Sequence, residues 1–241
     1  MISMKGQQVV VIGGTSGIGL AIARQSEAAG AHVNIASRRQ ASVDAALDLL
    51  KDAAGHVVDV LEPGSGSVMA LFDQVGPFDH LVYTAGEPLS MMTIADLDLD
   101  RARSFFEARY FGALNAVHMG VPHLAPGGSI TLTSGTAAER PGSGWALGAS
   151  VCGAMNSLTR CLAVELAPIR VNAVAPGVTR SAVWSQMSDA DRDGMYEQLG
   201  DVLPLGRVGE PTDAADAYVY CMTQPYTTGQ VVTVDGGSVL V

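Results

Sequence analysis

A glycine-rich turn near the amino terminus constrains the fold more than any other feature of this sequence. The stretch VVVIGGTSGIGLAIA (residues 9–23) sets three spaced glycines directly after an apolar run and at the start of a helical pattern. In a strand–turn–helix unit, such glycines permit the tight turn, the approach of backbone to a diphosphate, and close packing of the helix on the sheet. The helix amino terminus then faces the negative charge. The predicted dinucleotide-binding residues are Gly13, Thr15, Ser16, Gly17, Ile18 and Gly19. The alternative is a glycine turn without a ligand.

Short apolar runs alternate with helical patterns along the whole chain. The runs are rich in β-branched residues, as expected of parallel strands covered on both faces, and span 9–12, 31–36, 56–60, 80–83, 129–133, 171–175 and 231–234. The helical patterns span 17–29, 42–52, 67–74, 100–118, 145–166 and 212–222. This alternation predicts an α/β fold of the Rossmann type, a doubly wound parallel sheet with helices on both faces. No stretch reads as a linker, so we expect residues 1–241 to form one domain.

Composition restricts the partners of the chain. A hydrophobic fraction of 48% in 241 residues is ample for a large core, and a net charge of −10 argues against nucleic-acid or anionic-membrane partners. No apolar run reaches the roughly 20 residues of a membrane span, and the first residues read as a strand rather than a signal peptide. The three cysteines lack metal-type spacing, so we expect thiols, no metal site and a cytoplasmic location.

The residues after the second predicted strand indicate which dinucleotide binds. Ser37, Arg38 and Arg39 stand about 20 residues past the glycine turn, where a carboxylate would favour NAD. A guanidinium there suits the 2′-phosphate of NADP(H) through charge-assisted bidentate bonds, so we predict NADP(H) over NAD(H). The alternative is a pair of solvated surface arginines. Asp59 is predicted to meet the adenine or to cap the end of its strand.

The stretch 176–207 interrupts the alternation. It is polar, contains no convincing strand, and follows the sixth predicted strand at its carboxyl end, the edge at which such sheets bind ligands. We therefore expect residues of about 178–205 to form a lid over the substrate. The alternative is a surface excursion without a role.

Further motifs make the chain resemble the short-chain dehydrogenases/reductases over essentially its whole length. They are DV at 59–60, the last two residues of YTAG at 83–86, RVNAVAPGVTRS at 170–181, LGRVGEPTDAA at 205–215 and TTGQVVTVDGG at 227–237. The resemblance implies a seven-stranded sheet, a nicotinamide cofactor and a homodimer or homotetramer. It adds to the expected cofactor contacts Val60, Ala85, Gly86, Pro176, Gly177, Val178 and Thr179. The family's glycine turn usually begins with Thr, where this chain has Ile12.

The catalytic positions depart from the family pattern, which uses an Asn, a Ser, a Tyr and a Lys four residues after the Tyr. Ser134 matches the serine, whereas Arg109 falls on the asparagine. Gly148 and Cys152 fall on the tyrosine and the lysine, and the only lysines of the chain, Lys5 and Lys51, lie far upstream. Ser134 and Arg109 therefore remain as candidate catalytic residues.

Several replacements for the missing acid are conceivable. Arg109 would stabilise an oxyanion electrostatically, although a structural ion pair with Glu107 or a helix terminus is slightly favoured. Tyr83 and Tyr110 carry phenols, and Cys152 carries a thiol that is more often buried than reactive. The small Gly148 and Cys152, one turn apart, would also admit a bulkier ligand, which Trp145 would line.

Three functions fit these observations. The first is an NADP(H)-dependent oxidoreductase that transfers hydride to or from a small carbonyl, imine or related substrate through a non-standard active site. The second is a catalytically inactive NADP(H)-binding sensor, regulator or partner subunit. The third is a different reaction on the same fold.

Overall fold

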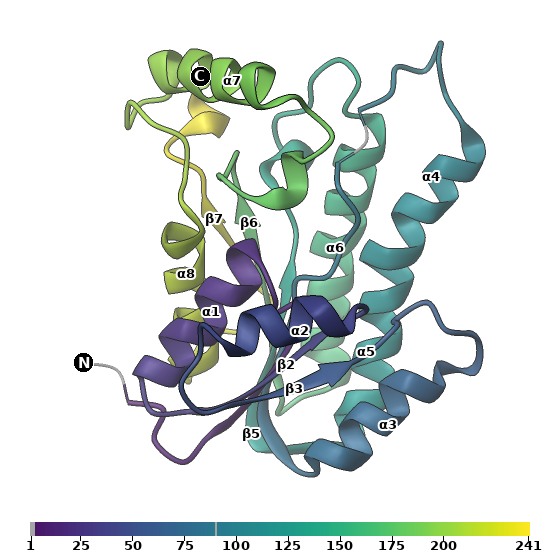
Figure 1. The fold of residues 1–241 in the computed structure, drawn as a ribbon, viewed down its shortest axis with the longest axis vertical. Helices are drawn as coiled ribbons and strands as arrows, with labels where there is room; N and C mark the ends of the chain where they lie inside the picture. Colours follow the sequence, from purple (N-terminus) through teal and green to yellow (C-terminus); the bar gives the residue numbers. More distant parts are fainter. Residues whose placement is uncertain (1–2, 90) are drawn as a thin grey trace.

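The computed structural model describes residues 3–89 and 91–241, which form one seven-stranded sheet in the order β3-β2-β1-β4-β5-β6-β7 (Figure 1). Every pair of neighbouring strands is parallel. The strands are β1 (Gln8–Ile12), β2 (His32–Ser37), β3 (Ala53–Val57), β4 (Phe78–Tyr83), β5 (Leu124–Thr133), β6 (Arg170–Pro176) and β7 (Val231–Val234). The strand order reverses between β1 and β4, and a ligand crevice is expected beyond the carboxyl ends of the strands at such a point.

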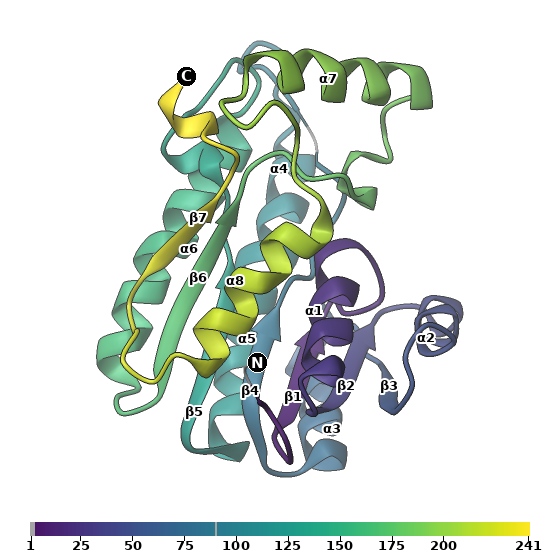
Figure 2. The same cartoon turned by 90° about the vertical axis from the view of Figure 1, so that its left-hand side faces the viewer.

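Helices cover both faces of the sheet. One core joins it to α1 (Gly17–Ala28), α2 (Gln40–Leu47) and α8 (Pro211–Thr223). The other joins it to α3 (Gly66–Val75), α5 (Gly112–Gly120) and α6 (Ala146–Glu165), with α4 (Leu99–Phe106) packed against α6. Helix α7 (Asp189–Val202) lies beyond the carboxyl end of β6 (Figure 2). Short 3-10 turns span Pro63–Ser65, Val121–His123, Thr136–Ala138, Ala182–Trp184 and Ser238–Leu240. Among the described residues, no helix has both the length and the apolar character needed to cross a membrane.

The predicted fold class is confirmed, but the predicted bounds of three elements were wrong. The third strand runs over Ala53–Val57 rather than 56–60, because it is an edge strand with mostly exposed side chains and needs no apolar run. Val58 instead enters the core from the loop that follows. The second helix covers Gln40–Leu47 rather than 42–52. Strand β5 begins at Leu124, since Leu124 pairs with Phe78 of β4 and a register shift separates this pair from the next, His80 with Ser129.

The helical pattern at 100–118 is not one regular helix. A π-helical turn, Glu107–Phe111, separates α4 from α5. The Gly112 N–H donates to the carbonyl of Glu107, five residues back, and the Ala108 carbonyl accepts a hydrogen bond from the Tyr83 hydroxyl. Such turns are often found at functional sites, and Arg109 lies in this one.

The segment predicted as a lid contains a helix that the sequence did not indicate. Helix α7 begins after Ser188, whose hydroxyl accepts from the Asp191 N–H, and Tyr196 is its only fully buried residue. A helix with so little apolar surface carries too weak a periodicity to be recognised from sequence.

Candidate functional site

A cavity of about 1020 Å³ opens at the point where the strand order reverses, and it is lined by residues from both ends of the chain. All seventeen predicted cofactor-binding residues line it, as do Ser134, Arg109, Gly148 and Cys152. The structure therefore brings together the predicted cofactor-binding residues and the residues at the four catalytic positions of the family.

The glycine turn forms a cradle that suits a diphosphate. A Cβ on Gly19 would lie 2.1 Å from the Gly13 carbonyl oxygen, so only glycine permits this approach of helix to turn. The N-cap of α1, Ser16, makes no side-chain cap hydrogen bond, and the first turn of α1 holds no acidic residue. The positive end of the helix dipole is thus left for a ligand, and the residues present fit a dinucleotide diphosphate.

The end of the cavity beside β2 carries the predicted cations. Arg38 Nη1 lies 3.3 Å from Glu87 Oε1, and Arg39 also lines the cavity. Asp59 lies two residues past β3, where its Oδ1 accepts from the Leu61 N–H at 3.0 Å. Asp59 therefore caps the turn that follows β3, rather than the strand itself, and borders the cavity.

Ser134 follows β5, and its hydroxyl is already engaged. The Ser134 Oγ donates to Asn156 Oδ1 at 2.6 Å and lies 3.2 Å from the Cys152 carbonyl oxygen. Asn156 lies one helical turn after Cys152 on α6 and is buried. In this arrangement, the proton with which Ser134 would polarise a substrate oxygen is directed at an amide.

Gly148 and Cys152 share one face of α6 beside the cavity. Gly148 does not leave an open hole, because a Cβ there would lie 3.4 Å from Cε3 of Trp145, an ordinary contact. Burial raises the pKa of the Cys152 thiol, a shift that the nearby Arg109 cation and the hydrogen bond with Ser134 oppose. The neutral thiol is therefore favoured over the thiolate nucleophile.

Arg109 is fixed by the chain around it. Its Nη2 donates to the carbonyl of Glu87, and its Cζ lies 4.6 Å from the centre of the Phe105 ring. The guanidinium covers Gly86, where a Cβ would come within 2.6 Å of Nη1. Burial lowers the pKa of Arg109. The structural interpretation of Arg109 gains support, but its partner is the Glu87 carbonyl and not Glu107.

Neither tyrosine that we considered as a replacement acid lines the cavity. Tyr83 is buried beneath Arg109, donates to the Ala108 carbonyl, and has a pKa raised by burial. No sequence motif marks Tyr218 of α8, which does border the cavity. Thr133 Oγ1 donates to the Tyr83 carbonyl, so the Tyr218 hydroxyl donates to Thr133 Oγ1 at 2.7 Å.

Residues 178, 179 and 181–185 of the segment predicted as a lid line the cavity. Trp184 is 5% exposed, and its ring centre lies 6.2 Å from that of Trp145 in an edge-to-face arrangement. Leu89 joins the loop after β4 to this segment through a hydrogen bond from its N–H to the Val183 carbonyl at 2.9 Å. No local sequence pattern marks Trp184 or Leu89 as site residues, because only the tertiary structure brings them beside Trp145.

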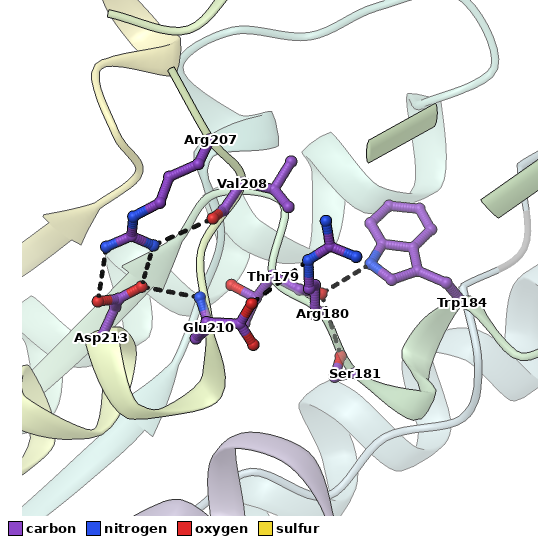
Figure 3. A network of polar contacts seen from close by, with 8 residues as sticks. All are labelled: Thr179, Arg180, Ser181, Trp184, Arg207, Val208, Glu210 and Asp213. Carbon is purple, nitrogen blue, oxygen red and sulfur yellow. Dashed lines mark hydrogen bonds and ion pairs between the residues drawn. The ribbon is translucent and has the colours of Figure 1, made fainter. Parts of the chain in front are cut away.

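Polar contacts fasten the base of this segment at both ends (Figure 3). On one side, Thr179 accepts at its carbonyl from the Trp184 indole at 3.0 Å, and Arg180 pairs with Glu210 at 3.3 Å. On the other, the two Arg207 Nη atoms bind Asp213 at 2.6 and 3.0 Å. We call segments 178–180 and 207–213 the clamp, because these contacts hold both ends of residues 181–206, the covering segment.

No group of three or more histidine, cysteine, aspartate or glutamate side chains suited to a metal ion occurs in residues 3–89 and 91–241.

Comparisons with known proteins agree with the fold. The family model of the SDR-like Rossmann domain matches residues 3–241. The short-chain dehydrogenase/reductase ATR9 of Stachybotrys chlorohalonatus is 35% identical, with 100% of each chain covered. The short-chain dehydrogenase/reductase fsr5 of Gibberella fujikuroi is 34% identical, with 98% of this chain and 96% of that protein covered.

Solved structures show the same likeness. A small-chain dehydrogenase in complex with NADPH is 37% identical at a TM-score of 0.87, with 98% of this chain and 99% of that one covered. The MalC reductase/Diels-Alderase of Malbranchea aurantiaca is 27% identical at a TM-score of 0.91, with 99% and 98% covered. With its parallel sheet, its glycine cradle and a family match over nearly the whole chain, this protein belongs to the short-chain dehydrogenases/reductases, a family of nicotinamide-dependent oxidoreductases.

Proposed function

We propose that this protein is an NADP(H)-dependent oxidoreductase whose substrate needs no proton from a phenol. The observation that carries the proposal is the cavity itself, which joins a complete dinucleotide cradle to a site bordered by Ser134, Gly148 and Cys152. The relative solved with NADPH and the cations Arg38 and Arg39 support NADP(H) over NAD(H).

The cofactor, when bound, supplies or accepts a hydride. The chain's own residues hold it: the turn from Gly13 to Gly19 and the α1 terminus take the diphosphate, and Arg38 takes the 2′-phosphate. Trp145 and Trp184 exclude water and present an apolar wall to the substrate.

The proton donors of the site limit which substrates it can reduce. Reduction of a ketone develops an alkoxide, and a positioned general acid is worth about 10²–10⁴ in rate. No phenol or ammonium stands at Gly148 or Cys152, and the Ser134 proton is directed at Asn156. Hydride addition to an iminium ion gives a neutral amine and develops no oxyanion, so imines that bind in their protonated form are the substrate class that this site serves best.

Cofactor binding and turnover are tested separately. The melting temperature is measured while NADPH or NADH is titrated into the protein. We expect NADPH to raise the melting temperature at lower concentrations than NADH does. A panel of imines, ketones and enones is then followed through the absorbance of NADPH, and we expect consumption with imines. No stabilisation by either cofactor would contradict the proposal.

A double variant tests whether only the acid is missing. Gly148→Tyr with Cys152→Lys restores the family pair, and the contact at Gly148 leaves room for a Cβ beside Trp145. We expect this variant to gain ketone reduction that the parent lacks. If NADPH binds but neither protein consumes it with any substrate, the alternative function applies, a sensor, regulator or partner subunit without turnover.

A further inference from the structure

We propose that Glu87 tunes the preference for NADP(H) by competing with the 2′-phosphate of the cofactor for Arg38. This inference rests on the proposed function, since it concerns how the same cavity holds its cofactor.

The ion pair spans the cavity at the strand that carries the glycine turn. Arg38 directly follows β2 and Glu87 lies four residues past β4, while β1 lies between these two strands in the sheet. The contact of 3.3 Å between Arg38 Nη1 and Glu87 Oε1 therefore bridges the carboxyl end of β1. Both residues line the cavity that contains the glycine turn.

The main chain of Glu87 is held in place by Arg109, and the Glu87 carboxylate extends towards Arg38. Arg109 donates to the Glu87 carbonyl, stacks on Phe105 and covers Gly86, which has no side chain to prevent it. Arg109 is thus a positioning residue for Glu87. Two arginines flank one glutamate, one on its backbone and the other on its side chain.

Two anions compete here for the same guanidinium. Glu87 contacts Arg38 through Nη1, so a 2′-phosphate that binds the bidentate face of the guanidinium that includes Nη1 displaces the carboxylate. NADH carries a neutral 2′-hydroxyl at that position, which forms no ion pair with the Arg38 guanidinium. Removal of the Glu87 charge should therefore strengthen NADPH binding and leave NADH binding nearly unchanged.

The expected effect is small, because the pair is exposed. The side chains of Arg38 and Glu87 are 57% and 43% exposed, and exposed pairs of this kind contribute little. We expect Glu87→Gln to lower the Kd for NADPH by about 1.5- to fivefold, the range that an exposed pair permits.

The test is a double-mutant cycle with isothermal titration of NADPH and NADH. The variants are Glu87→Gln, Arg38→Gln and the combination of the two. The matched control is Asp100→Asn, which removes the same charge from another exposed arginine pair, Arg103–Asp100 at 2.7 Å, where neither residue lines the cavity.

Competition predicts that Glu87→Gln tightens NADPH binding in the presence of Arg38 and has no effect in the Arg38→Gln background. Asp100→Asn should leave both Kd values unchanged. Equal tightening of NADPH and NADH, or the same gain without Arg38, would overturn competition. An unchanged NADPH Kd in Glu87→Gln would overturn it as well, while the proposed function would stand. If the wild-type protein bound no NADPH, the proposed function would fail first.

Discussion

Gly19 shows how strictly one position can be fixed by the cradle. Its Cβ would stand 2.1 Å from a backbone oxygen of Gly13 and 2.7 Å from Thr84 Oγ1, and a backbone atom cannot move aside without opening the turn. We expect Gly19→Ala to lower the free energy of unfolding by about 1–3 kcal/mol, as overpacking does, and to abolish the thermal shift with NADPH.

A second glycine provides the control. Gly194 lies inside α7, where a Cβ would meet nothing within 4 Å. Gly194→Ala should raise the free energy of unfolding by about 0.5–1 kcal/mol, because a helix interior favours alanine. NADPH binding by Gly19→Ala at wild-type affinity would mean that the cradle is not the diphosphate site.

The same contrast explains which site residues the sequence could predict. Gly13 and Gly19 were recognisable because backbone geometry accepts one residue type there, and Gly148 and Cys152 were recognisable by their spacing before the sixth strand. Asn156, Tyr218 and Glu87 gave no such signal. Their roles depend on hydrogen bonds or ion pairs to residues 22, 85 and 49 positions away in the chain.

At the scale of elements, the clamp below α7 determines how firmly the cavity is covered. Arg207 binds Asp213 with two hydrogen bonds, and Asp213 also accepts from the Glu210 N–H at 2.8 Å, so one carboxylate joins the end of the covering segment to the start of α8. The Arg207 guanidinium lowers the pKa of Asp213. Arg207→Gln should therefore loosen the covering segment.

Limited proteolysis measures that loosening. We expect cleavage within 185–203 to be several-fold faster in Arg207→Gln than in wild type, because local opening exposes the backbone. Arg192→Gln is the matched control, since it breaks an arginine–aspartate contact of the same kind, 2.7 Å to Asp189, within α7 itself. Equal cleavage rates in both variants would show that the clamp does not restrain the segment.

Elements differed in how well their sequence signals matched the structure. The central strands β1, β4 and β6 are buried on both faces, so their apolar runs marked them closely. The edge strand β3 and the polar helix α7 bury few apolar side chains. The pattern of apolar residues therefore placed β3 at the wrong residues and did not reveal α7. The π-helical turn depends on the contact between Tyr83 and Ala108, which no local pattern reveals.

At the scale of the whole molecule, we propose that a second copy docks against exposed apolar side chains of α6 and the adjoining π-helical turn. Val164 of α6 is 82% exposed, and Phe111 of the neighbouring π-helical turn is half exposed. We expect a homodimer or homotetramer that buries them. Val164→Asp should shift sedimentation towards the monomer, whereas Leu49→Asp, at an exposed apolar residue just beyond α2, should not. A wild-type monomer at micromolar concentration would contradict this expectation.

The stability of the whole sheet should also depend on one buried histidine. His80 of β4 is 2% exposed, its Nδ1 lies 2.8 Å from Ser129 Oγ of β5, and its Nε2 is buried without a partner. Burial lowers its pKa from 6.5 to about 4; the Arg170 cation acts in the same direction and Asp79 opposes it. The folded protein therefore keeps a neutral imidazole where the unfolded chain binds a proton.

The sign of the pH dependence follows from that difference. In the unfolded state His80 binds a proton below about pH 6.5, whereas in the folded state it binds one only below about pH 4. The free energy of unfolding therefore falls as the pH falls from 6.5 to 4. The loss attributable to His80 is at most about 3 kcal/mol. Urea unfolding at steps between pH 7.5 and 4.5 measures the slope, and His80→Gln, which keeps a hydrogen-bonding amide but cannot titrate, should flatten it. A difference in absolute stability between the two proteins does not affect the comparison, because only the dependence of the free energy of unfolding on pH is compared. If that slope is equal in wild type and variant, the acid sensitivity belongs to other groups.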